Sequence, residues 1–273
     1  MNDLKNGSLC ASLGKKSDKL PFTCDQVCGV RANHLLASKL FLTDDYQLYK
    51  PPRSFVFSFV RHPAKRAISD IFYFRSKQKG FRMTDNYILK RLTESGHDGF
   101  QIRYLSPVHI PVANKTLLFL KSGVRHIMSF YDFIGVVERM EESLVALKML
   151  LNLDHRDILH VNAKNSSVAY DPIAQEKRLS HNNLSPAIKN YLANEFVEKN
   201  RYDFKLYEKV NQALDNTIRS LNATEFAHNL AVHKYLMMKA TALCIHSTVC
   251  YWRDNGCGFE CLDSLVLNSS SLL

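Results

Sequence analysis

Three residues in the segment FVRHPAKRAIS, namely Arg61, Arg66 and Ser69, have the chemistry of a phosphate site. A guanidinium presents a planar fork of N–H donors that matches phosphate oxygens, and a serine hydroxyl adds one more donor. Arg66 lies one turn before Asp70 and is placed to pair with it. We therefore expect Arg61 and Ser69 to hold a phosphate monoester.

The elements around this segment would position it for that role. The apolar, β-prone run over residues 54–60 predicts a buried parallel strand, and residues 64–78 show helical spacing. Pro63 suits the first position of that helix. A strand, a tight turn and a helix would place Arg61 at the carboxyl edge of a sheet, toward which the helix directs its free N–H groups.

The same segment resembles the 3′-phosphate-binding motif of the Golgi carbohydrate sulfotransferases, which runs Phe-Val-Arg-x-Pro-x-x-Arg-x-x-Ser before aromatic residues. The resemblance implies that Arg61 and Ser69 hold the 3′-phosphate of 3′-phosphoadenosine 5′-phosphosulfate (PAPS), with Arg66 supporting. His62 departs from the pattern, because an acidic residue is usual there. DFIGVVERMEESLVALKMLL and YDFKLYEKVNQAL resemble two later stretches of the family, so the resemblance covers about residues 50–215.

The family also uses a lysine-bearing loop for the 5′-phosphosulfate, and KNGSLC, at residues 5–10, is similar to that loop. By this resemblance Lys5 neutralises the leaving phosphate, while Gly7 and Ser8 line a loop whose backbone N–H groups face the anion. The strand expected before the loop is missing, so an ordinary N-terminal segment with a glycosylation sequon at Asn6 is the alternative interpretation.

Sulfuryl transfer needs a base for the proton of the acceptor hydroxyl, and histidine suits that role near neutral pH. His34 lies between the two phosphate segments, where several members of this family place a catalytic histidine. An ordinary structural histidine is the alternative, and His97, His109 or a carboxylate are weaker candidates for the base. The resemblance implies no metal ion.

Positive charge is concentrated in the same part of the chain. The 273 residues have a formal net charge of +10, and residues 50–91 hold eleven Lys and Arg against two Asp, a net of +9. Such a cluster suits a phosphorylated cofactor, an acidic polysaccharide, nucleic acid or an acidic membrane surface, with a solvated basic helix face as the plain alternative. No nucleic-acid-binding module is recognisable, so we expect no nucleic-acid partner.

The rest of the sequence alternates predicted strands and helices. A second buried strand is expected over residues 132–137, followed by a strongly amphipathic helix from Glu138. The residues of that helix expected to face the core are Leu144, Leu147, Met149 and Leu150. Further helices are expected over residues 84–95, 114–127, 185–200 and 202–221. The pattern predicts an α/β fold with a P-loop-like parallel sheet flanked by helices, as one sulfotransferase domain over residues 1–222, and a cysteine-bearing C-terminal tail over residues 223–273.

Seven cysteines and six Asn-x-Ser/Thr sequons favour a secretory compartment. The four cysteines near the C-terminus predict a disulfide-braced tail, and their spacing differs from that of a zinc ribbon. They are Cys244, Cys250, Cys257 and Cys261. No stretch has the length and apolarity of a membrane span. We therefore expect a Golgi-lumenal, type II membrane glycoprotein whose N-terminal anchor is absent from this chain, with a cytosolic protein as the alternative.

The function that this resemblance implies is transfer of a sulfuryl group from PAPS to a hydroxyl of a carbohydrate acceptor. A non-catalytic polyanion-binding protein is the second candidate, because the basic segment alone would hold heparin-like chains. A P-loop kinase is a weaker candidate, since no Gly-x-x-x-x-Gly-Lys-Ser/Thr string occurs in the sequence.

Overall fold

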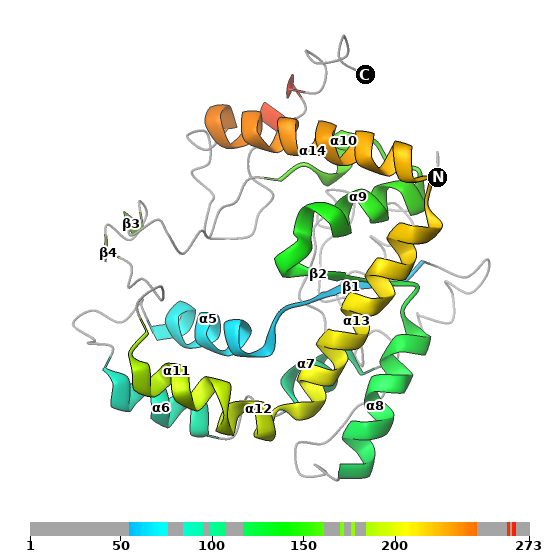
Figure 1. Ribbon diagram of the computed structural model, residues 1–273. Helices are drawn as coiled ribbons and strands as arrows, with labels where there is room; N and C mark the ends of the chain where they lie inside the picture. The colour runs from blue at the N-terminus through cyan, green and yellow to red at the C-terminus, as the bar shows by residue number, and fades with distance from the viewer. Residues whose placement is uncertain are drawn as a thin grey trace, which may run out of the picture.

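The computed structural model describes most of the chain between Phe55 and Cys244 and two short pieces after it (Figure 1). The described ranges are 55–75, 84–94, 99–106, 117–160, 170–171, 176–177, 184–244, 261–262 and 264–265. These residues form a mostly helical structure around a small parallel sheet of two strands. Parallel pairing is therefore confirmed for these two strands, and a larger, P-loop-like sheet stays a prediction.

The sheet pairs β1 (Phe57–Val60) with β2 (Phe133–Val136), so that Phe57 lies beside Phe133 and Val60 beside Val136. β2 is buried along its whole length, as predicted. The prediction of a buried first strand is wrong for most of β1, because Phe57 is 48% exposed and only Val60 is buried. Within the described residues β1 has a neighbouring strand on one side only.

The predicted helices are present with bounds close to those expected, whereas the helices Phe100–Leu105, His155–Ile158 and Ala223–Cys244 were not predicted. The elements outside the parallel sheet are α5 (Pro63–Arg75), α6 (Asp85–Thr93), α7 (Phe100–Leu105), α8 (Leu117–Phe130), the 3₁₀ turn η3 (Val137–Arg139), α9 (Met140–Leu151), α10 (His155–Ile158), the antiparallel pair β3 (Tyr170–Asp171) and β4 (Glu176–Lys177), α11 (Pro186–Ala193), α12 (Glu195–Lys199), α13 (Arg201–Ser220) and α14 (Ala223–Cys244). The single helix expected over residues 185–200 is divided at Asn194, whose backbone is not helical. Ser185 caps the first of the two halves, because its hydroxyl accepts the N–H of Ile188 at 3.3 Å.

Helix α13 is the centre of the packing. Its Leu206, Val210 and Leu214 are fully buried at helical spacing and pack with β2 in the main core. The helix also contacts α5, α7, α8, α9 and α14, and in Figure 1 it crosses in front of the sheet. A second apolar cluster joins α5, α6, α11 and α12, with Ile71 and Phe196 among its buried members. Both ends of the turn between β1 and α5 are therefore anchored in a core.

The approach of β2 to α9 is close. A Cβ on Gly135 would collide with the ring of Phe59 and lie 3.0 Å from the side chain of Ser143. The Ser143 hydroxyl also accepts the N–H of Val136 at 2.9 Å. Of the core residues predicted for this helix, Leu147 is buried, whereas Leu150 is 40% exposed and its prediction is wrong.

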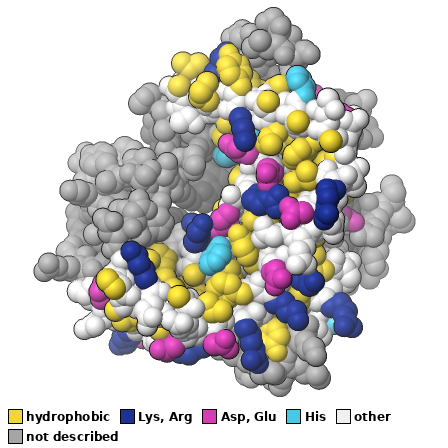
Figure 2. All heavy atoms as spheres, viewed as in Figure 1, with side chains coloured by type: hydrophobic (Ala, Val, Ile, Leu, Met, Phe, Trp, Pro, Cys, Tyr) yellow, Lys and Arg dark blue, Asp and Glu magenta, His cyan; other side chains and the backbone are white. Residues whose placement is uncertain are grey.

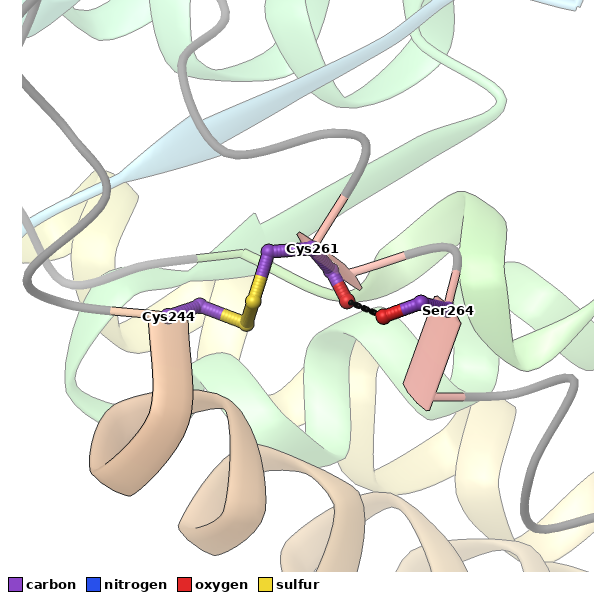
Figure 3. Close-up of a disulfide and its surroundings, with 3 residues drawn as sticks. All are labelled: Cys244, Cys261 and Ser264. Carbon is purple, nitrogen blue, oxygen red and sulfur yellow. Dashed lines mark hydrogen bonds between the residues drawn. A yellow bond between two sulfur atoms is a disulfide. The ribbon is translucent and has the colours of Figure 1, made fainter.

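Residues 223–244 form helix α14 inside the segment that we predicted to be a tail. The helix packs on α9, where Lys234 Nζ lies 3.8 Å from Glu141 Oε2, and it lies above α9 in Figure 1. A disulfide joins Cys244, at the end of α14, to Cys261 (Figure 3). This confirms the disulfide-braced tail for one pair of cysteines, while Cys250 and Cys257 lie outside the described residues. None of the described helices has the length and apolarity needed to cross a membrane.

The Cys244–Cys261 bond predicts a clear result in protein from a secretory host. After alkylation of free thiols in denaturant without reductant, neither Cys244 nor Cys261 should carry the label, and their two peptides should be linked. Adding a reductant before alkylation should release both peptides and label both residues. The measurement is peptide mass spectrometry, and labelling of both cysteines before reduction would contradict the disulfide.

Candidate functional site

The turn between β1 and α5 is held by hydrogen bonds to both of its amide groups. Val60 ends β1 in the core, and Pro63 begins α5 as predicted. The Arg61 N–H donates to Gln101 Oε1 at 2.9 Å. The His62 N–H donates to both carboxylate oxygens of Glu138, at 3.2 and 3.1 Å. The backbone of the predicted phosphate-binding turn is therefore rigidly placed by side chains from two other elements.

Glu138 lies in η3, two residues after the end of β2, and faces Arg61 at the carboxyl edge of the sheet. The Glu138 side chain is 18% exposed, and its Oε1 lies 4.0 Å from Arg61 Nε. The hydroxyl of Tyr207, from α13, donates to Glu138 Oε2 at 3.2 Å. In Figure 2 acidic and basic side chains alternate in the middle of the face, between α5 and α9. Arg61 directly follows Val60, the last residue of β1, so its predicted position at the end of a parallel strand is confirmed. Open α/β sheets bind their ligands at this edge.

The His62 ring is packed between two aromatic side chains of α13. The ring centroids of Phe204 and Tyr207 each lie 5.3 Å from that of His62, in edge-on geometry. Burial lowers the pKa of His62, outweighing the attraction of the Glu138 carboxylate, which raises it. His62 therefore stays neutral near pH 7 and fills an apolar position, where the family pattern has an acidic residue.

Arg66 and Ser69 lie on α5, in the first two turns after Arg61. The Arg66 guanidinium stacks on the ring of Phe100, 3.9 Å from its centroid. Burial lowers the pKa of Arg66, and the carboxylate of Asp203 opposes that shift more strongly than that of Asp70 does. Ser69 is half-buried. The Arg66 guanidinium therefore lies against α7. The carboxylate that raises its pKa most is that of Asp203 on α13, ahead of the predicted partner Asp70.

Asp203 and Gln101 are two residues of the site that the sequence analysis missed. Asp203 is 1% exposed, and its carboxylate accepts the N–H groups of Gln101 and Ile102, each at 3.1 Å. Burial raises the pKa of Asp203 to about 6, although these two hydrogen bonds and the nearby Arg66 lower it. Asp203 thereby anchors the start of α7, and α7 presents the Gln101 side chain to Arg61. The available signal was an Asp on the same helix face as Leu206 and Val210.

The other predicted site residues lie outside the described residues. They are Lys5, Gly7 and Ser8 of the 5′-phosphosulfate loop, the base candidate His34, and the weaker base candidates His97 and His109. The described part therefore contains one half of the predicted PAPS site, the half assigned to the 3′-phosphate.

Within the described ranges, no group of three or more His, Cys, Asp or Glu side chains has the arrangement of a metal site. No protein-family model, no curated protein and no solved structure matches this chain. The candidate site is therefore interpreted from its own geometry and from the resemblance of its motif.

Proposed function

We propose that this chain is a sulfotransferase that uses PAPS as co-substrate and acts on a hydroxyl of a carbohydrate. The observation that carries the proposal is the position of Arg61. It directly follows a strand paired in parallel, lies at the carboxyl edge of the sheet, and is two residues before the start of a 13-residue helix. An arginine and a helix N-terminus at such an edge form an anion site that suits a phosphate monoester. A larger P-loop-like sheet belongs to the same proposal.

The proposed reaction assigns a role to each predicted residue. Arg61 and Ser69 hold the 3′-phosphate with Arg66 in support, while Lys5, Gly7 and Ser8 hold the 5′-phosphosulfate. The acceptor oxygen forms a bond to sulfur as the bond from sulfur to the 5′-phosphate oxygen breaks, which releases adenosine 3′,5′-bisphosphate. His34 takes the proton of the acceptor hydroxyl, and Lys5 neutralises the charge on the leaving phosphate. No step of this reaction requires a metal ion.

The decisive experiment is a transfer assay with radiolabelled PAPS and a panel of glycans, followed by separation of the labelled products. Transfer to at least one glycan supports the proposal. Absence of transfer to every glycan, together with no binding of adenosine 3′,5′-bisphosphate in calorimetry, would overturn it.

A non-catalytic polyanion-binding protein is the second candidate, favoured by the net charge of +9 over residues 50–91. Calorimetry distinguishes the two candidates. A sulfotransferase binds adenosine 3′,5′-bisphosphate tightly, whereas a polyanion binder binds it weakly and prefers heparin-like chains, with an affinity that falls steeply as salt is added.

We also propose that the protein works in the Golgi lumen as a glycoprotein. The Cys244–Cys261 disulfide supports an oxidising compartment. Among the sequon asparagines, Asn222 lies within the described residues and is exposed at the start of α14, where its Oδ1 accepts the N–H of Glu225 at 3.0 Å. The amide nitrogen that a glycan would occupy is therefore not the atom that caps the helix.

Replacing Arg61 with alanine should weaken binding of adenosine 3′,5′-bisphosphate by about ten- to a hundredfold, because one charge-assisted hydrogen bond to phosphate is worth roughly 1.5–3 kcal/mol. Calorimetry on the whole chain measures the change. Arg91→Ala is the matched control, since Arg91 lies in the same basic segment but forms an exposed ion pair with Glu94 on α6. Equal losses in both variants would show that general positive charge, rather than a site at Arg61, binds the ligand.

A further inference from the structure

The edge of the sheet that suits a phosphate already contains a negative charge. Glu138 accepts the N–H of His62 at the start of α5, accepts the hydroxyl of Tyr207, and lies within ion-pair distance of Arg61. The proposed function assigns two groups to the ligand, the start of a helix and an arginine. The Glu138 carboxylate already interacts with both of them.

The contacts of Glu138 differ in kind. Those to His62 and Tyr207 are hydrogen bonds of 3.1 to 3.2 Å, whereas Arg61 Nε stays 4.0 Å away, beyond hydrogen-bonding distance. Arg61 Nε makes no hydrogen bond within the described part of the chain, and the Arg61 side chain is 33% exposed. Glu138 thus attracts Arg61 by charge without accepting a hydrogen bond from Arg61 Nε, an atom that is itself buried although a third of the side chain is exposed.

We propose that Glu138 is an internal counter-anion of the phosphate site, which holds Arg61 ready and limits how tightly a phosphate binds. This inference rests on the proposed function. When a phosphate arrives, the Arg61 guanidinium turns its fork to the ligand, while the hydrogen bonds to His62 and Tyr207 keep Glu138 in place. The remaining carboxylate then repels the bound phosphate across a short distance, which favours release of the bisphosphate product.

The test compares the affinity of adenosine 3′,5′-bisphosphate for the whole wild-type chain and for Glu138→Gln. Glutamine keeps the shape of the side chain and an oxygen that accepts the His62 N–H, but it removes the charge. We expect calorimetry to give a Kd about three- to tenfold lower for Glu138→Gln. Glu141→Gln is the matched control, because Glu141 lies on the next turn and pairs with Lys234 at the surface, and its Kd should match that of the wild type.

A second substitution separates charge from loosened packing. Tyr207→Phe removes one hydrogen bond to Glu138 but keeps its charge and the ring against His62, so its affinity should not rise. Glu138→Met, a neutral side chain of similar length, should bind more tightly than the wild type, and it serves if Glu138→Gln does not fold to the wild-type melting temperature.

The outcomes distinguish this inference from the proposed function. If the wild type binds and Glu138→Gln binds no more tightly, the counter-anion role is overturned and the phosphate site stands. A gain in Tyr207→Phe equal to that in Glu138→Gln also overturns the role, because packing would then explain both. If only Glu138→Gln binds, the role is supported and Glu138 blocks the site. If neither binds, the phosphate site and the counter-anion role both fail.

Discussion

Replacing Asp203 with alanine should lower the free energy of unfolding by about 2–5 kcal/mol at pH 7.5. The Asp203 carboxylate is buried and accepts two amide N–H groups at the start of α7, from Gln101 and Ile102. Without this carboxylate the two N–H groups stay buried and unpaired. The Arg66 guanidinium also loses the negative charge that raises its pKa most. Urea denaturation followed by circular dichroism measures the loss.

The control for Asp203 lies on the same helix. Asp215→Ala removes a carboxylate whose side chain is 51% exposed and which pairs with Arg139 at the surface. Exposed pairs contribute little, so we expect a change of about 1 kcal/mol or less. A loss of that size in Asp203→Ala as well would contradict the anchoring role of Asp203.

The pH dependence gives a further check on Asp203. Its pKa is raised to about 6 in the folded protein, so the folded state binds a proton between about pH 6 and 4 that the unfolded chain binds only nearer pH 4. The contribution of Asp203 to stability is therefore greatest at low pH and is lost as the pH rises through about 6. The cost of Asp203→Ala should accordingly be larger at pH 5 than at pH 7.5.

Local patterns in the sequence were enough to predict the unit that positions Arg61. The patterns that predict this unit are the apolar run, Pro63 and the helical spacing after it, all within about 25 residues. Each of them indicates the backbone conformation of the residues in which it occurs. What a strand buries depends instead on its neighbours, so the same apolar run did not predict the exposure of Phe57.

The contacts that hold the site were not predictable in the same way. His62 and Glu138 are 76 positions apart, and Gln101 and Asp203 are 102 apart. Such pairs meet only once β1 and β2 are aligned in register and α13 is packed on the sheet. The sequence marks Asp203 as a carboxylate on a buried helix face, but it does not indicate which N–H groups that carboxylate accepts.

Helix α14 was missed for a related reason. Apolar side chains occur on several of its faces, with Leu236 and Ala240 buried while Met238 and Leu243 are more than 60% exposed. A segment without one apolar stripe lacks the pattern by which an amphipathic helix is predicted. The position of α14 depends on its packing against α9. It also depends on Leu262 and Leu265, which pack on α14 next to the Cys244–Cys261 disulfide.

The packing of α14 should make the protein sensitive to acid. His233 is fully buried, and neither of its ring nitrogens has a hydrogen-bond partner among the residues that the structure describes. Its ring stacks with that of His155 from α10, with the centroids 6.4 Å apart. Burial, with the neighbouring His160 and His155, lowers the pKa of His233 to about 4. Burial is also the largest cause that lowers the pKa of His155, followed by Lys148 and His228, while a hydrogen bond with Asn229 and the Asp154 carboxylate raise it. For His160, burial lowers the pKa, while a hydrogen bond to the backbone of Ile158 and the Glu141 carboxylate raise it.

The sign of the effect follows from where each state takes up the proton. The unfolded chain protonates His233 near pH 6.5 and the folded protein only near pH 4, so stability is fully present above about 6.5 and falls as the pH drops toward 4. Between pH 7.5 and 5 this residue alone should cost the wild type about 2 kcal/mol of unfolding free energy. His155 and His160, whose pKa values are also lowered by burial, act in the same direction.

Replacing His233 with leucine should remove that part of the acid sensitivity. Within the described part of the chain the His233 ring nitrogens make no hydrogen bond that leucine would lose, so we expect stability at pH 7.5 within about 1 kcal/mol of the wild type. The difference in unfolding free energy between pH 7.5 and 5 should shrink by about 2 kcal/mol, measured by urea denaturation at both pH values. His126→Leu, at an exposed position of α8, should leave that difference unchanged. An unaltered pH dependence in His233→Leu would mean that the buried ring does not set the acid sensitivity of α14.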